Sequence, residues 1–195
     1  MLTAQEIRHA LNPGKVAAFL RELGEHPSFL DATDRSVPPQ RMLDREFVLR
    51  FAAFYLVPYP SYEGPMDVFL THQMGALNKA PDARLEEVRT RFIAAMGAAQ
   101  ALLSRHAFRK RVRGSDRRKP INKALFEAWS VALARLTEAE VATVLARKDA
   151  VDDRLLALFD DGDFFNAVTQ GTGDPLRVKK RFGSVEALVR AVIGA

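Results

Sequence analysis

The densest concentration of chemistry in this sequence is a run of basic residues in its second half. Between Arg105 and Lys119 the chain carries eight positive side chains, with Asp116 as the one acidic residue among them. Cations at this density suit contacts to nucleic-acid phosphates, although such a run is also typical of an ordinary solvated surface that carries little of the core. Base stacking is poorly supported because Phe108 is the only aromatic residue in the stretch. The candidate phosphate-binding residues are Arg105, Arg109, Lys110, Arg111, Arg113, Arg117, Arg118 and Lys119.

A second candidate is Arg50, which interrupts the apolar run at residues 47–56. An unpaired guanidinium in a protein core is very costly, so Arg50 needs an acidic partner. Glu46 lies one helical turn earlier, in the favourable order of acid before base, and Asp44 is close by. We therefore expect a partly buried ion pair that fixes helix packing, rather than a catalytic arginine.

Other kinds of site lack the residues that they require. The chain has no cysteine, and its four histidines show no two-histidine ligand spacing, so we expect no metal site. The segment around His26 lacks the glycines of a phosphate-holding turn and is expected to be a loop. Asp174, before a predicted helix, would repel an anion, and no phosphate-binding loop motif occurs. We expect no cofactor.

The elements that position these residues are predicted to be helices. The chain shows no sustained alternation of apolar and polar residues and no hairpin turn between apolar runs. Thr3 with Glu6 and Thr137 with Glu140 form the sequence pattern of a capping box, which starts a helix. Residues 47–56 and 124–133 are apolar on nearly every face. We therefore predict an all-α fold, a compact multi-helix bundle with two central apolar helices, as a single domain over residues 1–195.

Hydrophobic spacing and turn-forming residues predict the boundaries of the helices. Residues 31–40 and 111–121 carry proline, glycine, serine or aspartate and are expected to be loops. A break at Gly183 separates two short helices near the end of the chain. The predicted helices cover about 3–11, 16–24, 47–56, 67–78, 82–106, 124–133, 137–148, 150–160, 162–170, 174–182 and 184–193.

Composition and charge indicate the cellular location and the distribution of charge over the surface. No segment has about 20 consecutive apolar residues, and the first residues do not have the pattern of a signal sequence, so we expect no membrane association. A chain without cysteine fits a reducing cytoplasm. Residues 105–123 hold nine basic residues against one acidic residue, whereas residues 138–163 hold eight acidic residues against three basic ones. This segregation predicts one basic face and one acidic lobe.

Three segments taken together resemble a known family. They are residues 2–8 (LTAQEIR), 41–51 (RMLDREFVLRF) and 122–128 (NKALFEA), and weaker likeness extends to 165–166 and 178–181. In this order they look like the helical portion of the domain-of-unknown-function 262 proteins, which are ParB-like, sulfiredoxin-like proteins of GmrSD-type restriction systems and related phage defence. The positions that carry the resemblance are Gln5, Glu6, Arg8, Asp44, Glu46, Arg50, Asn122 and Lys123.

The resemblance implies a role in restriction or phage defence. The chain lacks both the Asp-Gly-Gln-Gln-Arg motif that hydrolyses nucleotides in relatives and their His-Asn-His nuclease domain. We therefore expect a non-catalytic helical module that binds either the phosphate backbone of DNA or a protein partner. We do not expect the isolated chain to be an enzyme. The alternative is a fragment or split half of an NTP-dependent, modification-specific restriction enzyme. In that case Gln5, Glu6 and Arg8 would complete an active site supplied by a missing segment or a partner chain.

The first predicted helix carries an apolar side formed by Ile7, Ala10 and Leu11. In relatives this helix follows directly from the ParB-like half of the protein, so we expect its apolar side to lack a cover here. Self-association, or binding to a ParB-like half, would bury that side.

Overall fold

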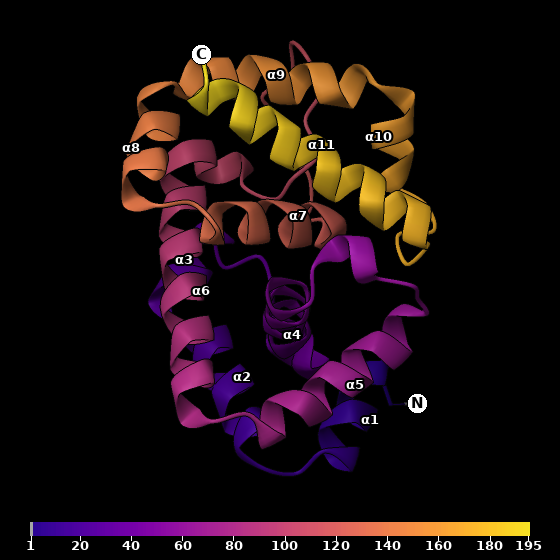
Figure 1. The fold of residues 1–195 in the computed structure, drawn as a ribbon. Coiled ribbons are helices and arrows are strands. Elements are labelled where there is room, and N and C mark those ends of the chain that lie inside the picture. Colours follow the sequence, from indigo (N-terminus) through magenta and orange to yellow (C-terminus); the bar gives the residue numbers. More distant parts are fainter. Residues whose placement is uncertain (1) are drawn as a thin grey trace.

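The computed structural model describes residues 2–195, and its elements are helices (Figure 1). Across these residues there are eleven α-helices, three 3₁₀ turns (Gln40–Met42, Tyr59–Ser61 and Ser104–His106) and no strand, so the predicted all-α fold is confirmed. The α-helices are α1 (Ala4–Leu11), α2 (Lys15–Glu25), α3 (Pro27–Ala32), α4 (Leu43–Leu56), α5 (Met66–Lys79), α6 (Asp82–Leu103), α7 (Lys123–Ala134), α8 (Glu138–Ala146), α9 (Lys148–Asp160), α10 (Gly162–Ala167) and α11 (Pro175–Ile193).

Both predicted capping boxes are present. The Thr3 hydroxyl accepts a hydrogen bond from the amide of Glu6 at 3.2 Å, and the Glu6 carboxylate accepts one from the amide of Thr3 at 2.6 Å. The same exchange between Thr137 and Glu140 starts α8. These contacts satisfy amides that the first turn of a helix leaves without a backbone partner, which is why α1 and α8 begin where the sequence predicts.

Helix α3 forms where the sequence predicts a loop around His26. The ring nitrogen Nδ1 of His26 accepts a hydrogen bond from the amide of Ser28 at 3.2 Å, and Pro27 occupies the first helical position. Proline suits that position because it has no amide hydrogen to satisfy. The prediction failed because histidine is not one of the residue types that usually cap a helix.

Helix α11 is continuous, although the sequence predicts two helices separated by Gly183. A glycine inside a helix costs only about 1 kcal/mol. The apolar stripe on both sides of Gly183, which includes Phe182 and Val185, is buried and offsets that cost. Neither α11 nor any other helix within residues 2–195 is long and apolar enough to cross a membrane.

Helix α7 lies in the middle of the molecule, where it packs against α4, α6 and α11 (Figure 1). The rings of Phe47 on α4 and Phe126 on α7 are 4.9 Å apart between centroids, and Trp129 is buried on the same helix. Burying one such aromatic side chain is worth roughly 1.5–3 kcal/mol. The two apolar helices expected at the centre of the bundle are therefore α4 and α7.

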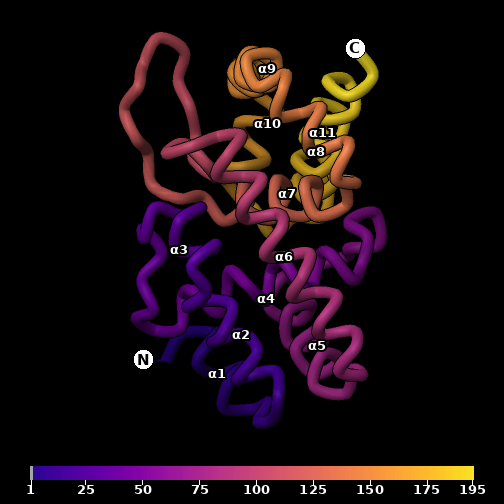
Figure 2. Tube along the Cα trace, turned by 90° about the vertical axis from the view of Figure 1, so that its left-hand side faces the viewer, coloured from indigo at the N-terminus to yellow at the C-terminus, as the bar shows by residue number. Residues whose placement is uncertain are grey.

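Residues 107–122 form a long loop that extends between α3 and α9 (Figure 2). The two ends of the loop are held together, because the amide of Asn122 donates a hydrogen bond to the backbone oxygen of Phe108 at 2.9 Å. An isolated bridge between Arg109 and Ile121 lies beside this bond. The loop contains most of the basic residues that the sequence singles out, so its placement decides what they can bind.

Candidate functional site

The loop at residues 107–122, which we call the basic loop, does not form a separate basic face. Part of it lies against the acidic stretch at residues 138–163. Arg111 forms an ion pair with Asp152, and Arg113 Nη2 lies 3.2 Å from Asp160 Oδ2. Both aspartates belong to α9, beside which the loop runs (Figure 2). The predicted separation into a basic face and an acidic lobe is therefore wrong here, since the two blocks of opposite charge attract each other across a short distance.

Two more of the predicted phosphate-binding residues have carboxylate partners. Arg105 Nη2 lies 3.6 Å from Asp116 Oδ2, and Arg118 forms an ion pair with Asp34. All four side chains are exposed, by 46% to 79%. Exposed pairs of this kind contribute little to stability, so a bound anion can compete for these two arginines.

Arg109 departs most from its predicted role. Its residue surface is only 4% exposed. It donates hydrogen bonds to the backbone oxygens of Lys119 (2.5 Å) and Thr33 (3.2 Å) and to the Ser36 hydroxyl (2.8 Å). These acceptors are neutral, and burial lowers the pKa of the guanidinium. The expectation that Arg109 carries little of the core is wrong, because it ties the loop to the end of α3.

Three further residues of the loop, like Arg109, have no carboxylate partner within residues 2–195. They are Lys110, Arg117 and Lys119. Lys110 lies over the ring of Phe165, with its Nζ 5.5 Å from the ring centroid. Arg117 is exposed and Lys119 is half-buried. These side chains keep a positive charge that no acid of the described chain neutralises.

Several of these cations line one cleft of about 520 Å³. It lies between the segment that follows α3, the first turns of α4 and the end of the basic loop. A recess with low-dielectric walls focuses the field of the charges that line it. We call it the basic cleft, and its basic residues are Arg109, Arg117, Arg118, Lys119 and Lys123.

A second group of charges is buried where α4, α7 and α11 meet. The predicted pair is confirmed, since Arg50 Nε donates a hydrogen bond to Glu46 Oε1 at 2.9 Å. Arg50 also contacts Glu127, whose other carboxylate oxygen accepts a hydrogen bond from Arg181. Lys123 Nζ donates to Glu46 Oε2 at 2.9 Å. These five residues form a continuous chain of ion pairs, which we call the core charge network.

Two members of the core charge network, Glu127 and Arg181, were not predicted from the sequence. Both side chains are 0% exposed. A signal for Glu127 was present, because it is an acid in an otherwise apolar helix, the same feature that singles out Arg50. Arg181 gives no comparable signal, since it follows Lys179 and Lys180 and so has the pattern of a solvated basic group.

The core charge network fixes the ionisation of Glu46. Burial opposes the charge on its carboxylate, but the nearby Arg50 and Lys123 outweigh burial and hold the pKa of Glu46 below its ordinary value of 4.5. Glu46 is therefore an anion at neutral pH. Lys123 belongs both to this network and to the lining of the basic cleft, so it connects the two.

The residues of α1 that resemble the family motif face the interior. Gln5 and Arg8 are 1% and 3% exposed, and Arg8 Nε donates a hydrogen bond to Gln5 Oε1 at 3.0 Å. Arg8 Nη1 also lies 2.8 Å from Asp67 Oδ1 on α5. Glu6 is used by the capping box of α1. The enzyme-fragment alternative needs these side chains in an active site, whereas here they support the packing of α1.

Two other positions that resemble the family motif also have structural contacts. Asp44 is 3% exposed at the start of α4, and burial raises the pKa of its carboxyl. Asn122 caps α7, because its side-chain oxygen accepts a hydrogen bond from the amide of Leu125 at 2.9 Å. The Asn122 side-chain nitrogen donates to the backbone oxygen of Val168 at 2.7 Å. Asn122 thus joins the end of the basic loop to the segment after α10.

The other side of α1 is exposed, as predicted. Ile7 and Leu11 are 44% and 70% exposed, and Ala10 beside them is exposed as well. Leu2, just before the helix, is 63% exposed. This small helix therefore turns apolar side chains outward and polar side chains inward, the reverse of the usual arrangement.

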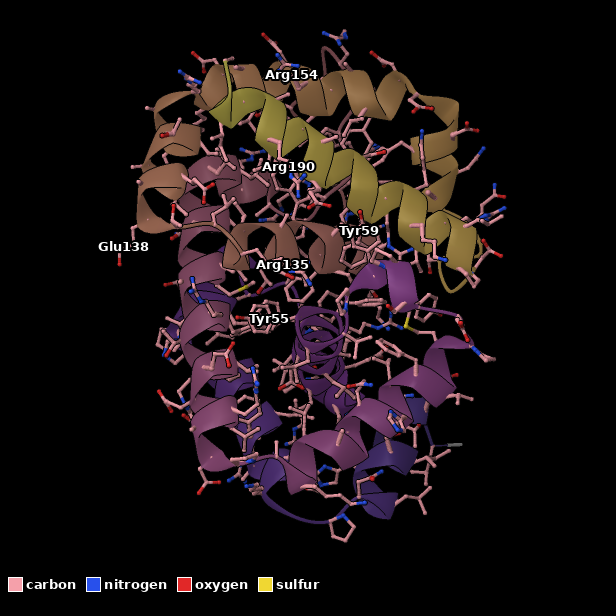
Figure 3. The ribbon with its side chains drawn as sticks, viewed as in Figure 1. Tyr55, Tyr59, Arg135, Glu138, Arg154 and Arg190 are labelled. Atoms are coloured by element: carbon pink, nitrogen blue, oxygen red, sulfur yellow. The ribbon has the colours of Figure 1, made fainter. Side chains whose placement is uncertain are left out.

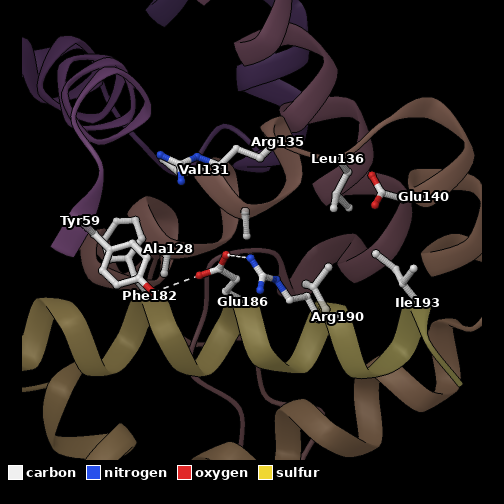
Figure 4. Close-up of a pocket in the computed structure, with 12 residues that line it drawn as sticks. Tyr59, Ala128, Val131, Arg135, Leu136, Glu140, Phe182, Glu186, Arg190 and Ile193 are labelled. Atoms are coloured by element: carbon white, nitrogen blue, oxygen red, sulfur yellow. Dashed lines mark hydrogen bonds and ion pairs between the residues drawn. The ribbon is translucent and has the colours of Figure 1, made fainter.

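A further cavity, of about 280 Å³, lies between α7 and α11 (Figure 4). Tyr59 and Arg190 each donate a hydrogen bond to the Glu186 carboxylate, at 3.0 Å and 2.5 Å. Arg135 donates to the backbone oxygen of Phe54 at 3.4 Å. The charged groups here thus have protein partners, whereas Arg117 and Lys119 of the basic cleft have no carboxylate partner within residues 2–195.

Figure 3 shows this same region from the front, with Tyr59, Arg135 and Arg190 gathered beside α7 and α11. Glu138 points outward from α8 and is exposed. Within residues 2–195 no group of three or more histidine, aspartate or glutamate side chains is placed to hold a metal ion. No family model, no curated protein and no solved structure matches this chain.

Proposed function

We propose that this chain is a non-catalytic helical module that binds the phosphate backbone of nucleic acid through the basic cleft and the adjoining loop. The observation that carries this proposal is the cleft itself, where the accessible side chains of Arg117 and Lys119 have no carboxylate partner among the described residues. Phosphate contacts from such side chains give affinity without reading base sequence. The loop offers no rigid array of arginine or asparagine side chains for base edges, so binding is weak and insensitive to sequence.

The resemblance to the helical portion of domain-of-unknown-function 262 proteins supports a place in restriction or phage defence. Systems of this kind act on nucleic acid, which fits a module that contacts phosphates. A cytoplasmic location fits both this role and a sequence without cysteine.

A second function is favoured by the orientation of α1. Its exposed Ile7 and Leu11 form an apolar side next to the exposed Leu2. Exposed apolar patches on soluble proteins often mark protein contacts. We propose that this side is buried by a second copy of the chain or by a ParB-like half, alongside the nucleic-acid contact rather than instead of it.

The nucleic-acid proposal is tested by titrating labelled duplex and single-stranded DNA with the protein at low and at moderate salt. The informative variant is Arg117→Glu combined with Lys119→Glu, because neither side chain has an acidic partner to lose. Arg109 is unsuitable, since its replacement removes three buried hydrogen bonds. We expect this double charge reversal to abolish the DNA binding that the wild type shows.

The matched control is Arg21→Glu combined with Lys79→Glu. Both positions are exposed, and they lie on α2 and at the end of α5, away from the basic loop (Figure 2). The two double variants change the net charge equally. Comparing them therefore distinguishes loss of a binding site from loss of the overall attraction between the protein and DNA. Equal losses in both variants, or no binding by the wild type at low salt, would contradict the proposal.

A further inference from the structure

The basic cleft has a buried positive charge at its edge that the rest of the protein does not neutralise. Arg109 is 4% exposed, and its hydrogen bonds go to two backbone oxygens and the Ser36 hydroxyl. A charge inside a protein is screened far less than one on the surface, so its attraction for an anion in the adjoining recess is strong. The hydrogen bonds hold the guanidinium in place, and therefore its field is already in position before any ligand binds.

The other cations of the cleft add to the charge of Arg109. Arg117 and Lys119 have no carboxylate partner within residues 2–195. Arg118 and Lys123 each have one, Asp34 and Glu46, and Glu46 is shared with Arg50. The lining therefore carries more positive charge than its neighbouring carboxylates can offset. A group with two negative charges gains more from such a lining than a group with one.

The cleft also has apolar walls and more room than a phosphate group needs. Leu43, Pro120 and Ile121 contribute to the lining, and the space is about 520 Å³. Leu43 and Ile121 are half-buried and Pro120 is exposed, so their surfaces remain accessible to a ligand. The combination of an anion site and an apolar wall is typical of pockets that hold a phosphorylated organic molecule.

We propose that the basic cleft binds the phosphomonoester of a nucleotide, with the phosphate against Arg117 and Lys119 and the nucleoside against the apolar wall. This inference rests on the proposed function, because it assumes that the basic cleft binds nucleic acid or its components. A phosphomonoester carries about −1.5 to −2 charges at neutral pH, whereas each internal phosphate of a strand carries one. The source of the monoester is either a free mononucleotide or the phosphorylated end of a strand.

The test is a calorimetric titration of the whole chain with adenosine 5′-monophosphate, with adenosine and with inorganic phosphate. We expect adenosine to bind at least about ten-fold more weakly than its monophosphate, because the charge-assisted contacts are lost. Inorganic phosphate should also bind more weakly, because it does not reach the apolar wall. Replacing Arg117 and Lys119 by alanine should weaken monophosphate binding by about ten-fold or more, while Arg21→Ala combined with Lys79→Ala should leave it unchanged.

Circular dichroism of both alanine double variants shows whether they keep the helical fold, which we expect because all four positions are exposed or half-buried. Equal binding of adenosine and its monophosphate would overturn the inference. Unchanged monophosphate affinity in the Arg117 and Lys119 variant would overturn it as well.

The two sources of the monoester are separated by short single strands with a 5′-phosphate or a 5′-hydroxyl. Tighter binding of the phosphorylated strand supports recognition of a strand end. Equal binding of the two strands, together with retained monophosphate binding, supports a free mononucleotide. These results are independent of the proposed backbone contact, because duplex DNA without terminal phosphates tests that contact alone. Absence of binding to both the monophosphate and the phosphorylated strand rejects the inference even where such a duplex binds.

Discussion

Glu127 on α7 and Arg181 on α11 form an ion pair in which neither side chain has any exposed surface. Arg181 Nη1 also donates a hydrogen bond to the backbone oxygen of Thr172 at 2.8 Å. The other oxygen of Glu127 contacts Arg50 on α4, so one carboxylate joins three helices. Taking such charges out of water is costly, and the pair is tolerated only because every member has a partner.

Replacing Glu127 by glutamine should therefore destabilise the fold strongly. The variant keeps the shape of the side chain but leaves Arg181 without its carboxylate and removes one partner of Arg50. Breaking a buried pair from one side costs about 3–5 kcal/mol of the free energy of unfolding. Chemical denaturation monitored by circular dichroism measures this loss.

The control for this prediction is Glu86→Gln on α6. Glu86 also accepts a hydrogen bond from an arginine, Arg89, at 2.9 Å, but its side chain is 65% exposed. Exposed pairs contribute about 0–1 kcal/mol, so the control should unfold almost as the wild type does. Similar losses in Glu127→Gln and the control would show that burial of the pair does not matter.

A double-mutant cycle tests the pair of Arg50 and Glu46. Arg50→Leu alone leaves Glu46 buried with only Lys123, and it also removes a partner of Glu127. In the Glu46→Leu background the first of these losses no longer applies, so Arg50→Leu should cost less there. We expect a coupling energy of about 1–3 kcal/mol, measured as a difference between free energies of unfolding. Strictly additive losses would mean that the two residues are not coupled.

The carboxyl of Asp44 should make stability depend on pH in an unusual direction. Burial raises its pKa above the ordinary value of 3.8, and its Oδ1 atom has no hydrogen-bond partner. A raised pKa in the folded state means that stability is highest when Asp44 is protonated and is lost as pH rises through that pKa. Asp44→Asn should therefore be more stable than the wild type at pH 7, with a difference that shrinks as the pH falls.

Glu46→Gln should show the opposite effect at pH 7 when the free energy of unfolding of both variants is measured as a function of pH by chemical denaturation. Because Arg50 and Lys123 outweigh burial and lower the pKa of Glu46, its stabilising effect is present above 4.5 and is lost as the pH falls. This variant should be less stable than the wild type at pH 7, again with a shrinking difference in acid. An advantage of Asp44→Asn that grows in acid would contradict the role given to burial.

The exposed side of α1 should promote association. Changing Ile7 and Leu11 to glutamine removes apolar surface that is 44% and 70% exposed in the single chain. We expect sedimentation velocity to show that the wild type self-associates as its concentration rises and that the double variant does so less. Leu176→Gln is the control, since Leu176 is an exposed apolar residue on a different helix, α11. A wild type that stays monomeric at high concentration would contradict self-association.

Most of the fold could be predicted because it depends on local patterns. Capping boxes at Thr3 and Thr137 and the apolar runs of α4 and α7 are visible in a short window of sequence. The cap at His26 is also local, but histidine is not a usual capping residue, and the unbroken helix across Gly183 depends instead on burial of neighbouring residues. Such tertiary packing is not visible in a local pattern, and it can override the preference of a single residue.

The candidate site could be predicted only in part, because a run of basic residues in the sequence does not show where their side chains lie in the fold. The sequence identifies the basic residues but not their partners, so the pairing of Arg111 with Asp152, 41 positions away, was not predicted. Nor could spacing show that Arg109 is buried while Lys119 stays accessible. Arg50 was different, since a lone charge in an apolar helix demands a partner, and the nearest acid one turn away was the correct one.

The most direct test of nucleic-acid binding through the basic cleft is the salt dependence of DNA affinity for the wild type and for Arg117→Ala combined with Lys119→Ala. Each phosphate neutralised contributes about −0.9 to the slope of log affinity against log salt concentration on duplex DNA. If Arg117 and Lys119 each neutralise one phosphate, the slope of the variant should be shallower by about 2, and its affinity should be lower at every salt concentration. Identical slopes for the two proteins would show that the basic cleft does not contact the phosphates.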